Sequence, residues 1–341
     1  MIINWWFLPA VGGLSFFLTW VLRRYALKRS LLDIPNARSS HSAPTPRGGG
    51  VAIVITFLLA VGLLAVAQLV SWTSLAALLG SGAFVALVGF LDDHGHIAAR
   101  WRLLTHFFAA IWVLAWLGGA PPLIVFGTTF DLSWTGVGLA SVYLVWLLNL
   151  YNFMDGIDGI ASVEAISVCL GGYLLYMLTG QFALATLPLV LGVSVAGFLC
   201  WNFPPARIFM GDAGSGFLGI ALGTLSLQAG WVAPELFWSW LILLGVFVCD
   251  ATFTLIRRLM RGDKVYEAHR SHAYQYASRQ FGRHLPVTVA VGAINLFWLL
   301  PVALLVGTQR LDGLLGVLIA YLPLVALAAK FHAGELEVRE P

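Results

Sequence analysis

The sequence predicts an all-α, polytopic integral membrane protein with about eleven transmembrane helices. Its 341 residues are 60% hydrophobic and only 10% charged, whereas soluble domains carry about 25% charged residues. The apolar residues also gather in runs close to the roughly 20 residues that cross a bilayer as one helix. A soluble fold has too little interior for so much apolar side chain. We therefore expect a single transmembrane domain over residues 1–341.

The first apolar run has no basic residue before it and four soon after it, which is typical of a transmembrane helix rather than of a cleaved signal peptide. Ten further apolar runs follow. The predicted spans are residues 2–22, 50–70, 75–91, 103–118, 136–153, 160–179, 182–200, 214–229, 237–256, 286–307 and 312–330.

Basic residues predict the orientation of these spans, because cytoplasmic loops are enriched in Lys and Arg. With eleven spans and an external N-terminus, 18 of the 19 Lys and Arg residues fall on the cytoplasmic side, and only Arg310 falls outside. We therefore expect a periplasmic N-terminus, a cytoplasmic C-terminus and a place in the bacterial inner membrane. The chemically rich segments all lie in the cytoplasmic loops.

The first such segment, residues 41–50, contains two prolines, Arg47 and three successive glycines. Glycine lets backbone N–H groups approach a ligand closely, and an arginine offers several donors to a phosphate. The alternative is a turn with an anchoring positive charge.

The second is the pair Asp92 and Asp93 at the end of the third span. Two adjacent carboxylates repel one another, so a cation is expected beside them. They fit either a divalent ion or a proton-transfer site. The structural alternative is a solvated loop end paired with Arg100 or Arg102.

The third segment, residues 149–159, places Asn149, Asn152, Asp155 and Asp158 three residues apart. On a helix this spacing forms one slowly turning polar stripe. Amide and carboxylate oxygens are ligands that Mg²⁺ prefers. Polar residues this close to a bilayer also favour a functional role.

The fourth segment, residues 209–216, opens the eighth span with Asp212, Gly214 and Ser215. A glycine-rich helix N-terminus can bind phosphate through its exposed N–H groups, and Asp212 can hold a metal ion. The alternative is that Asp212 or Ser215 only caps the helix.

The basic loop 257–285 contains His269, Arg270 and His272, which suit a pyrophosphate clamp; attraction to anionic lipid is the alternative. Asp250, inside the ninth span, is either a functional acid or part of a structural ion pair. The remaining histidines are interpreted as non-ligands: His94, His96, His106 and His284.

Taken in order, PTPRGGG, LDD, NLYNFMDGIDG, FMGDAGSG and HRSH resemble the polyprenyl-phosphate N-acetylhexosamine-1-phosphate transferases of glycosyltransferase family 4. The wording HRSHAYQ is most similar to the branch that initiates O-antigen and enterobacterial common antigen. A peptidoglycan translocase would be expected to show three successive histidines there.

The resemblance implies that a lipid phosphate attacks the sugar-linked phosphorus of a UDP-N-acetyl sugar. Undecaprenyl-pyrophosphoryl-sugar forms at the cytoplasmic face and UMP leaves. The implied cofactor is Mg²⁺, with Mn²⁺ as the alternative. The implied partners are undecaprenyl phosphate, the UDP-sugar and membrane lipid. A homodimer is compatible with the family, and no nucleic-acid partner is expected.

Residue by residue, the resemblance assigns metal coordination to Asp212 and Asn152. It assigns uracil recognition to Asp158, with Asp155 near it. Asp92 and Asp93 correspond to the pair at the lipid phosphate, where one acts as base. The sugar-phosphate clamp corresponds to His269, Arg270 and His272. The further substrate-binding residues are expected from the segments themselves, and they are Arg47, Asn149, Asn152, Gly214 and Ser215.

One position departs from the family, because His96 stands where many members have a third aspartate. Direct attack and a covalent aspartyl intermediate both stay open, as does the identity of the sugar. The alternative function is an ion-coupled transporter, which would place its acids at mid-membrane and often shows internal repeats.

Overall fold

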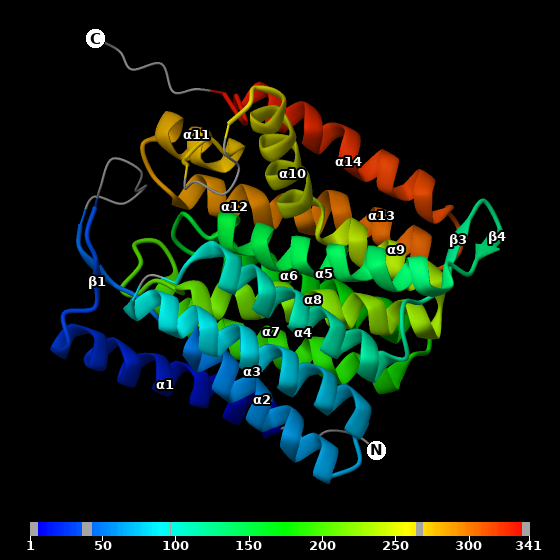
Figure 1. Cartoon of the computed structure of the whole chain (residues 1–341), viewed down its shortest axis with the longest axis horizontal. Coiled ribbons are helices and arrows are strands. Elements are labelled where there is room, and N and C mark those ends of the chain that lie inside the picture. Colours follow the sequence, from blue (N-terminus) through cyan, green and yellow to red (C-terminus); the bar gives the residue numbers. More distant parts are fainter. Residues whose placement is uncertain (1–5, 36–42, 96, 264–268, 336–341) are drawn as a thin grey trace.

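The computed structural model describes residues 6–35, 43–95, 97–263 and 269–335. His96 and the outer parts of loops 41–50 and 257–285, including His41, Glu267 and Ala268, lie outside these ranges. The described chain is an all-α bundle with two short β-hairpins, so the predicted fold class is confirmed (Figure 1).

The helices of the bundle lie at the positions of the predicted spans, two of which contain more than one helical element. They are α1 Phe7–Lys28, α2 Val51–Val66, α3 Trp72–His94, α4 Ala99–Leu117, α5 Ser133–Met154, α6 Ile160–Leu178, α7 Phe182–Asn202, α8 Asp212–Val232, α9 Pro234–Leu243, α10 Gly245–Met260, α12 Leu285–Ile294, the π-helix η1 Asn295–Leu299, α13 Leu300–Gly307 and α14 Gly313–Lys330.

Seven helices in the described ranges are long and apolar enough to cross a membrane, or eight if the bent pair α9–α10 counts as one span. The count of eleven crossings and the side of each terminus therefore stay predictions. Large apolar side chains cover the outer surface of the bundle. Examples are Leu63, Phe297 and Leu322, whose exposed fractions are 62%, 74% and 67%. Such a surface suits a hydrocarbon solvent.

The predicted span 237–256 is wrong as a single helix, because α9 and α10 meet at an angle of 70°. In a continuous helix, the N–H of Gly245 would donate to the carbonyl of Leu241. The hydroxyl of Tyr321 on α14 donates to that carbonyl instead, at 2.6 Å. A side chain on Gly245 would lie 2.9 Å from the Tyr321 ring. The break therefore lets α14 pack closely against the bend.

Elements outside the predicted spans lie in the loops. The first hairpin, β1 Leu32–Asp33 with β2 Thr45–Pro46, pairs Leu32 with Pro46. The second, β3 Leu123–Val125 with β4 Thr128–Phe130, pairs Leu123 with Phe130 at the other end of the bundle (Figure 1). The short helix α11 Ala273–Phe281 lies within the basic loop.

Helix α8 forms the centre of the bundle. In its most apolar 18-residue window, 83% of the residues are buried, against 28% for α14 at the edge. Its glycines let neighbouring backbones approach: a side chain on Gly214 would lie 2.6 Å from Gly50 Cα, and one on Gly219 would lie 2.6 Å from Leu148 Cα. Small residues at helix contacts are the usual means of close packing in membranes.

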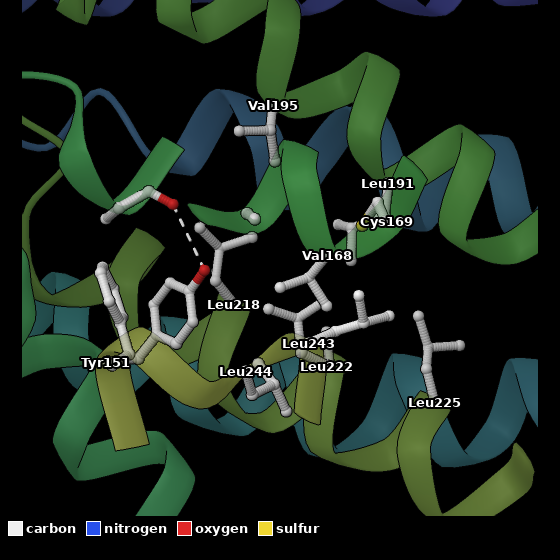
Figure 2. Packing of buried hydrophobic residues seen from close by; sticks show 14 of the residues in the cluster. Tyr151, Val168, Cys169, Leu191, Val195, Leu218, Leu222, Leu225, Leu243 and Leu244 are labelled. Atoms are coloured by element: carbon white, nitrogen blue, oxygen red, sulfur yellow. Dashed lines mark hydrogen bonds between the residues drawn. The ribbon is translucent and has the colours of Figure 1, made fainter. Parts of the chain in front are cut away.

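Apolar side chains from α5, α6, α7, α8 and α9 fill the space beside α8 (Figure 2). Tyr151 of α5 is fully buried there, and its hydroxyl donates to the carbonyl of Ala161 at 3.3 Å. This bond joins the end of α5 to the start of α6. The core therefore fixes both helices that flank residues 155–159.

We expect Gly50→Ala to destabilise the protein, because the added methyl group would meet Gly214 Cα at 2.5 Å and the Met210 carbonyl at 2.9 Å. Overpacking of this kind costs roughly 1–3 kcal/mol. The measurement is thermal unfolding of the purified protein in detergent. Gly62→Ala is the control within α2, the helix that Gly50 caps, because no atom of a neighbouring element lies within 4 Å of the added methyl group. Equal melting temperatures for the two variants would contradict the packing argument.

Candidate active site

The carboxylates of Asp92 and Asp93 lie at the C-terminal end of α3, and each is held differently. Asp92 accepts a hydrogen bond from the Ile97 N–H at 2.7 Å and forms an ion pair with Arg102 at 2.6 Å. Asp93 faces the backbone N–H groups of Asp212 and Ala213 at the start of α8. Its Oδ2 atom is buried and has no hydrogen-bond partner among the described residues.

Arg102 of α4 lies between two acids. Its Nη1 atom is 2.6 Å from Asp92 Oδ2 and 3.5 Å from Asp212 Oδ2. The pairing with Arg102 that the structural alternative expected is found for Asp92. The contact of Arg102 with Asp212 was missed by sequence reasoning. Asp212 is about 110 residues away along the chain, so no local spacing indicates the contact.

Arg47 approaches the site from the loop before α2. Its guanidinium donates to the backbone carbonyl of Asp93 and lies 4.0 Å from the Asp93 carboxylate. The N–H groups of Gly49 and Gly50 donate to the carbonyls of Phe209 and Met210, at 2.9 and 2.8 Å. These two glycines therefore join two loops to each other rather than presenting free donors to a ligand.

The start of α8 is built around Gly211, which has a φ of 77°. Its carbonyl accepts hydrogen bonds from the N–H groups of Gly214 and Ser215, at 3.0 and 3.1 Å, and from the Ser215 hydroxyl at 3.2 Å. Both residues are buried, and their donors are used within the helix. Asp212 is the residue of this turn that reaches the surface, with its side chain 33% exposed.

The predicted helical stripe over residues 149–158 is wrong beyond Asn152, because α5 ends at Met154. Asn149 turns toward α4, where its amide nitrogen lies 3.3 Å from His106 Nδ1. Asp155 follows the helix end, and Asp158 lies in the turn that leads into α6. The glycines of this segment allow the chain to leave the helix, so its polar side chains point in different directions.

Asp155 lies close to the other acids. Its partial burial, together with three neighbouring carboxylates, raises the pKa of Asp155 well above its usual range. Those carboxylates belong to Asp212, Asp93 and Asp158. The ends of α3, α5 and α8 thus collect negative charge at one place.

Asp158 lines a separate pocket of about 440 Å³. Its carboxylate accepts from the Ala206 N–H at 3.0 Å and lies 3.1 Å from His284 Nδ1. His284, which the sequence analysis interprets as a non-ligand, thus pairs with a predicted site residue. Phe209 and Arg283 also line this pocket.

His269 and His272 lie side by side in the loop before α11, with ring centroids 4.8 Å apart. His272 is 2% exposed. His269 Nδ1 contacts the Ser271 hydroxyl at 3.0 Å, and the backbone carbonyl of Arg270 accepts from Arg279 at 3.3 Å. Phe153 of α5 stacks near His272 at 6.4 Å, which places this loop beside residues 155–159.

The acids fit a divalent cation. The partnerless Oδ2 atom of Asp93 and the crowding around Asp155 both indicate unbalanced negative charge. No three Asp, Glu, His or Cys side chains in the described ranges form a ready-made metal cage. Mg²⁺ commonly takes only one or two carboxylates and completes its shell with water and substrate phosphates. Asp212, whose carboxylate reaches the surface, suits that kind of site, and metal binding by Asp212 and Asn152 stays a prediction.

Comparison with known proteins identifies the family of this chain. The family model described as "Glycosyl transferase family 4" matches residues 75–230, the part of the chain that contains Asp92, Asp93, Asp155, Asp158 and Asp212. The chain is 31% identical to the probable undecaprenyl-phosphate N-acetylglucosaminyl 1-phosphate transferase of Bacillus subtilis, over 75% of this chain and 72% of the relative.

Two further relatives have similar identity. The undecaprenyl-phosphate alpha-N-acetylglucosaminyl 1-phosphate transferase of Thermotoga maritima is 29% identical over 84% of this chain and 86% of the relative. The phospho-N-acetylmuramoyl-pentapeptide-transferase of Moorella thermoacetica is 34% identical over 54% of this chain and 62% of the relative. The chain therefore belongs to glycosyl transferase family 4, as the resemblance of its motifs predicts.

Proposed function

We propose that this enzyme, a glycosyl-1-phosphate transferase, transfers an N-acetyl amino-sugar 1-phosphate from a UDP-sugar to undecaprenyl phosphate and releases UMP. The observation that carries this proposal is the cluster of Asp92, Asp93, Asp155 and Asp212 at adjoining helix ends. Two anionic substrates would be brought together there, and a cation is needed to offset their repulsion. The named activities of the relatives support the same reaction.

The pocket beside Asp158 suits the nucleotide of the donor. Its volume of about 440 Å³ lies in the range of small-molecule sites. Phe209 offers an aromatic surface, Asp158 an acceptor for base N–H groups, and Arg283 a positive charge. The loop of His269, Arg270 and His272 then lies on the side of the diphosphate and sugar.

In the reaction, an oxygen of the lipid phosphate forms a bond to the sugar-linked phosphorus, and the bond from that phosphorus to UMP breaks. Arg47 beside Asp93 and Arg102 beside Asp92 bind the phosphate groups, while one aspartate of this pair acts as base. Asp212 and Asn152 would hold Mg²⁺, which offsets phosphate charge when bound. The product is undecaprenyl-pyrophosphoryl-sugar, the first lipid intermediate of an O-antigen or another envelope glycan.

The transporter alternative is less well supported. The clustered carboxylates lie at helix ends on the face of the bundle that carries the basic loops, rather than half-way along the helices. A carrier would instead need its charged site at mid-membrane.

The deciding experiment measures nucleotide release by the purified protein with Mg²⁺, undecaprenyl phosphate and a panel of UDP-N-acetyl sugars. We expect UMP only when lipid and Mg²⁺ are both present, and the best donor identifies the sugar. Release of UDP would indicate ordinary glycosyl transfer and overturn the mechanism. No release from any donor, by a folded sample, would favour the transporter.

Asp212→Asn is expected to lower turnover by about 100-fold or more, because it removes the exposed carboxylate proposed for the metal. The melting temperature should stay close to that of the wild type, since this side chain reaches the surface. Asp131→Asn, in the loop at the opposite end of the bundle, is the matched loss of one acid. Near-normal turnover of Asp212→Asn would refute the metal assignment.

The proposed orientation can be tested with single cysteines at Thr128 and Gln280, which are both exposed. The background carries Cys200→Ser, because Cys200 is the exposed cysteine while Cys169 and Cys249 are buried. A membrane-impermeant maleimide should label position 128 in intact cells and position 280 only after the inner membrane is opened. The reverse pattern would overturn the cytoplasmic placement of the site.

A further inference from the structure

We propose that Asp250 is a positioning residue for the sugar-phosphate clamp, where it fixes the start of α11 and the orientation of the His272 ring. This inference rests on the proposed transferase function. Asp250 lies on α10 beyond the 70° bend and is 7% exposed. The sequence leaves two roles open for Asp250, a functional acid or one side of a structural ion pair. Its contacts combine the two roles, because Asp250 pairs with His272 and so orients a residue of the proposed clamp.

The Asp250 carboxylate caps α11. Its Oδ1 atom accepts from the Ala273 N–H at 2.9 Å, and its Oδ2 atom accepts from the Tyr274 N–H at 3.0 Å. The first N–H groups of any helix have no partner within the helix, and a carboxylate is a favourable acceptor for them. The hydroxyl of Thr254, one turn along α10, also donates to Oδ1 at 3.1 Å. This carboxylate is therefore held in one position.

The same carboxylate orients the ring of His272. The Nδ1 atom of His272 lies 3.3 Å from Asp250 Oδ1, in a region where both side chains are buried. A carboxylate at Nδ1 holds the proton on that nitrogen and fixes the ring plane. The Nε2 atom is then left to contact a ligand.

Helix α11 is also tied to the acidic site. The hydroxyl of Tyr274 donates to the Phe153 carbonyl at 2.9 Å, and it packs against Gly156 so closely that no side chain would fit there. Phe153 and Gly156 flank Asp155 in the sequence. Asp250 holds the start of α11, and Tyr274 of α11 contacts the end of α5. Together these contacts fix the distance between the clamp and the end of α5.

Asp250→Asn should disturb this arrangement without emptying the space. An amide has one acceptor oxygen instead of two, and its NH₂ group would face an N–H donor. We expect the KM for the UDP-sugar to rise about 10- to 100-fold, as is typical when a group that orients a ligand-binding histidine is removed. The KM for undecaprenyl phosphate should change by less than about twofold, because the lipid phosphate is proposed to bind at Asp92 and Asp93.

The test compares the steady-state kinetics of UMP release for Asp250→Asn, His272→Gln, the double variant and Asp263→Asn. Asp263 is the matched control, since it follows α10 and pairs with Arg258 and Arg261 rather than with the clamp. If Asp250 acts through His272, the double variant should have the donor KM of His272→Gln alone, which is the signature of coupled residues. If Asp250→Asn does not fold, Thr254→Val is measured in its place. This isosteric and less disruptive variant should raise the donor KM about threefold.

The outcomes separate the two proposals. Absence of UMP release by the wild-type protein would refute the transferase and this inference with it. Activity in the wild type, with Asp250→Asn and Thr254→Val both equal to Asp263→Asn, would refute the inference alone. The inference would also be overturned if Asp250→Asn lowered kcat, left every KM unchanged and multiplied with the effect of His272→Gln in the double variant. That combination would show a purely structural role.

Discussion

The constraint on which the acidic end of the bundle depends is the repulsion among carboxylates that the fold forces together. Asp93 of α3 and Asp212 of α8 lie close to Asp155 at the end of α5, and burial together with their charges raises the pKa of Asp155. Arg102 and Arg47 supply positive charge at the edges of the group. Such an arrangement is unfavourable for a scaffold and useful for a site that must receive a cation and two phosphorylated substrates.

The bend between α9 and α10 determines where Asp250 lies. If α9 and α10 were one straight rod, Asp250 would lie in line with the span instead of beside α11. The bend is stabilised by Tyr321, whose hydroxyl takes the place of a backbone donor. From that point α10 reaches the loop of His269 and His272, so a single change in helix direction links the core of the bundle to the proposed donor site.

The sequence predicted the positions of the helices well, because long apolar runs are strong signals. The orientation expected from the basic residues stays a prediction. The bend at Gly245 could not be predicted, since it depends on Tyr321 of a helix more than 70 residues later. The motifs also identified residues that do meet, such as Asp92, Asp93 and Asp212. Their partners were harder to foresee: Arg102 and His284 carry no motif of their own, and only the fold brings them to Asp212 and Asp158.

The contact between Gly50 and Gly214 has a consequence for how the sequence can vary. At most interior contacts, a larger side chain on one helix can be accommodated by a smaller one on its neighbour. Here both partners are already glycine and their backbones touch. No compensating substitution therefore exists at either position, and the two loops that border the acidic cluster cannot drift apart by small steps while the protein keeps its packing.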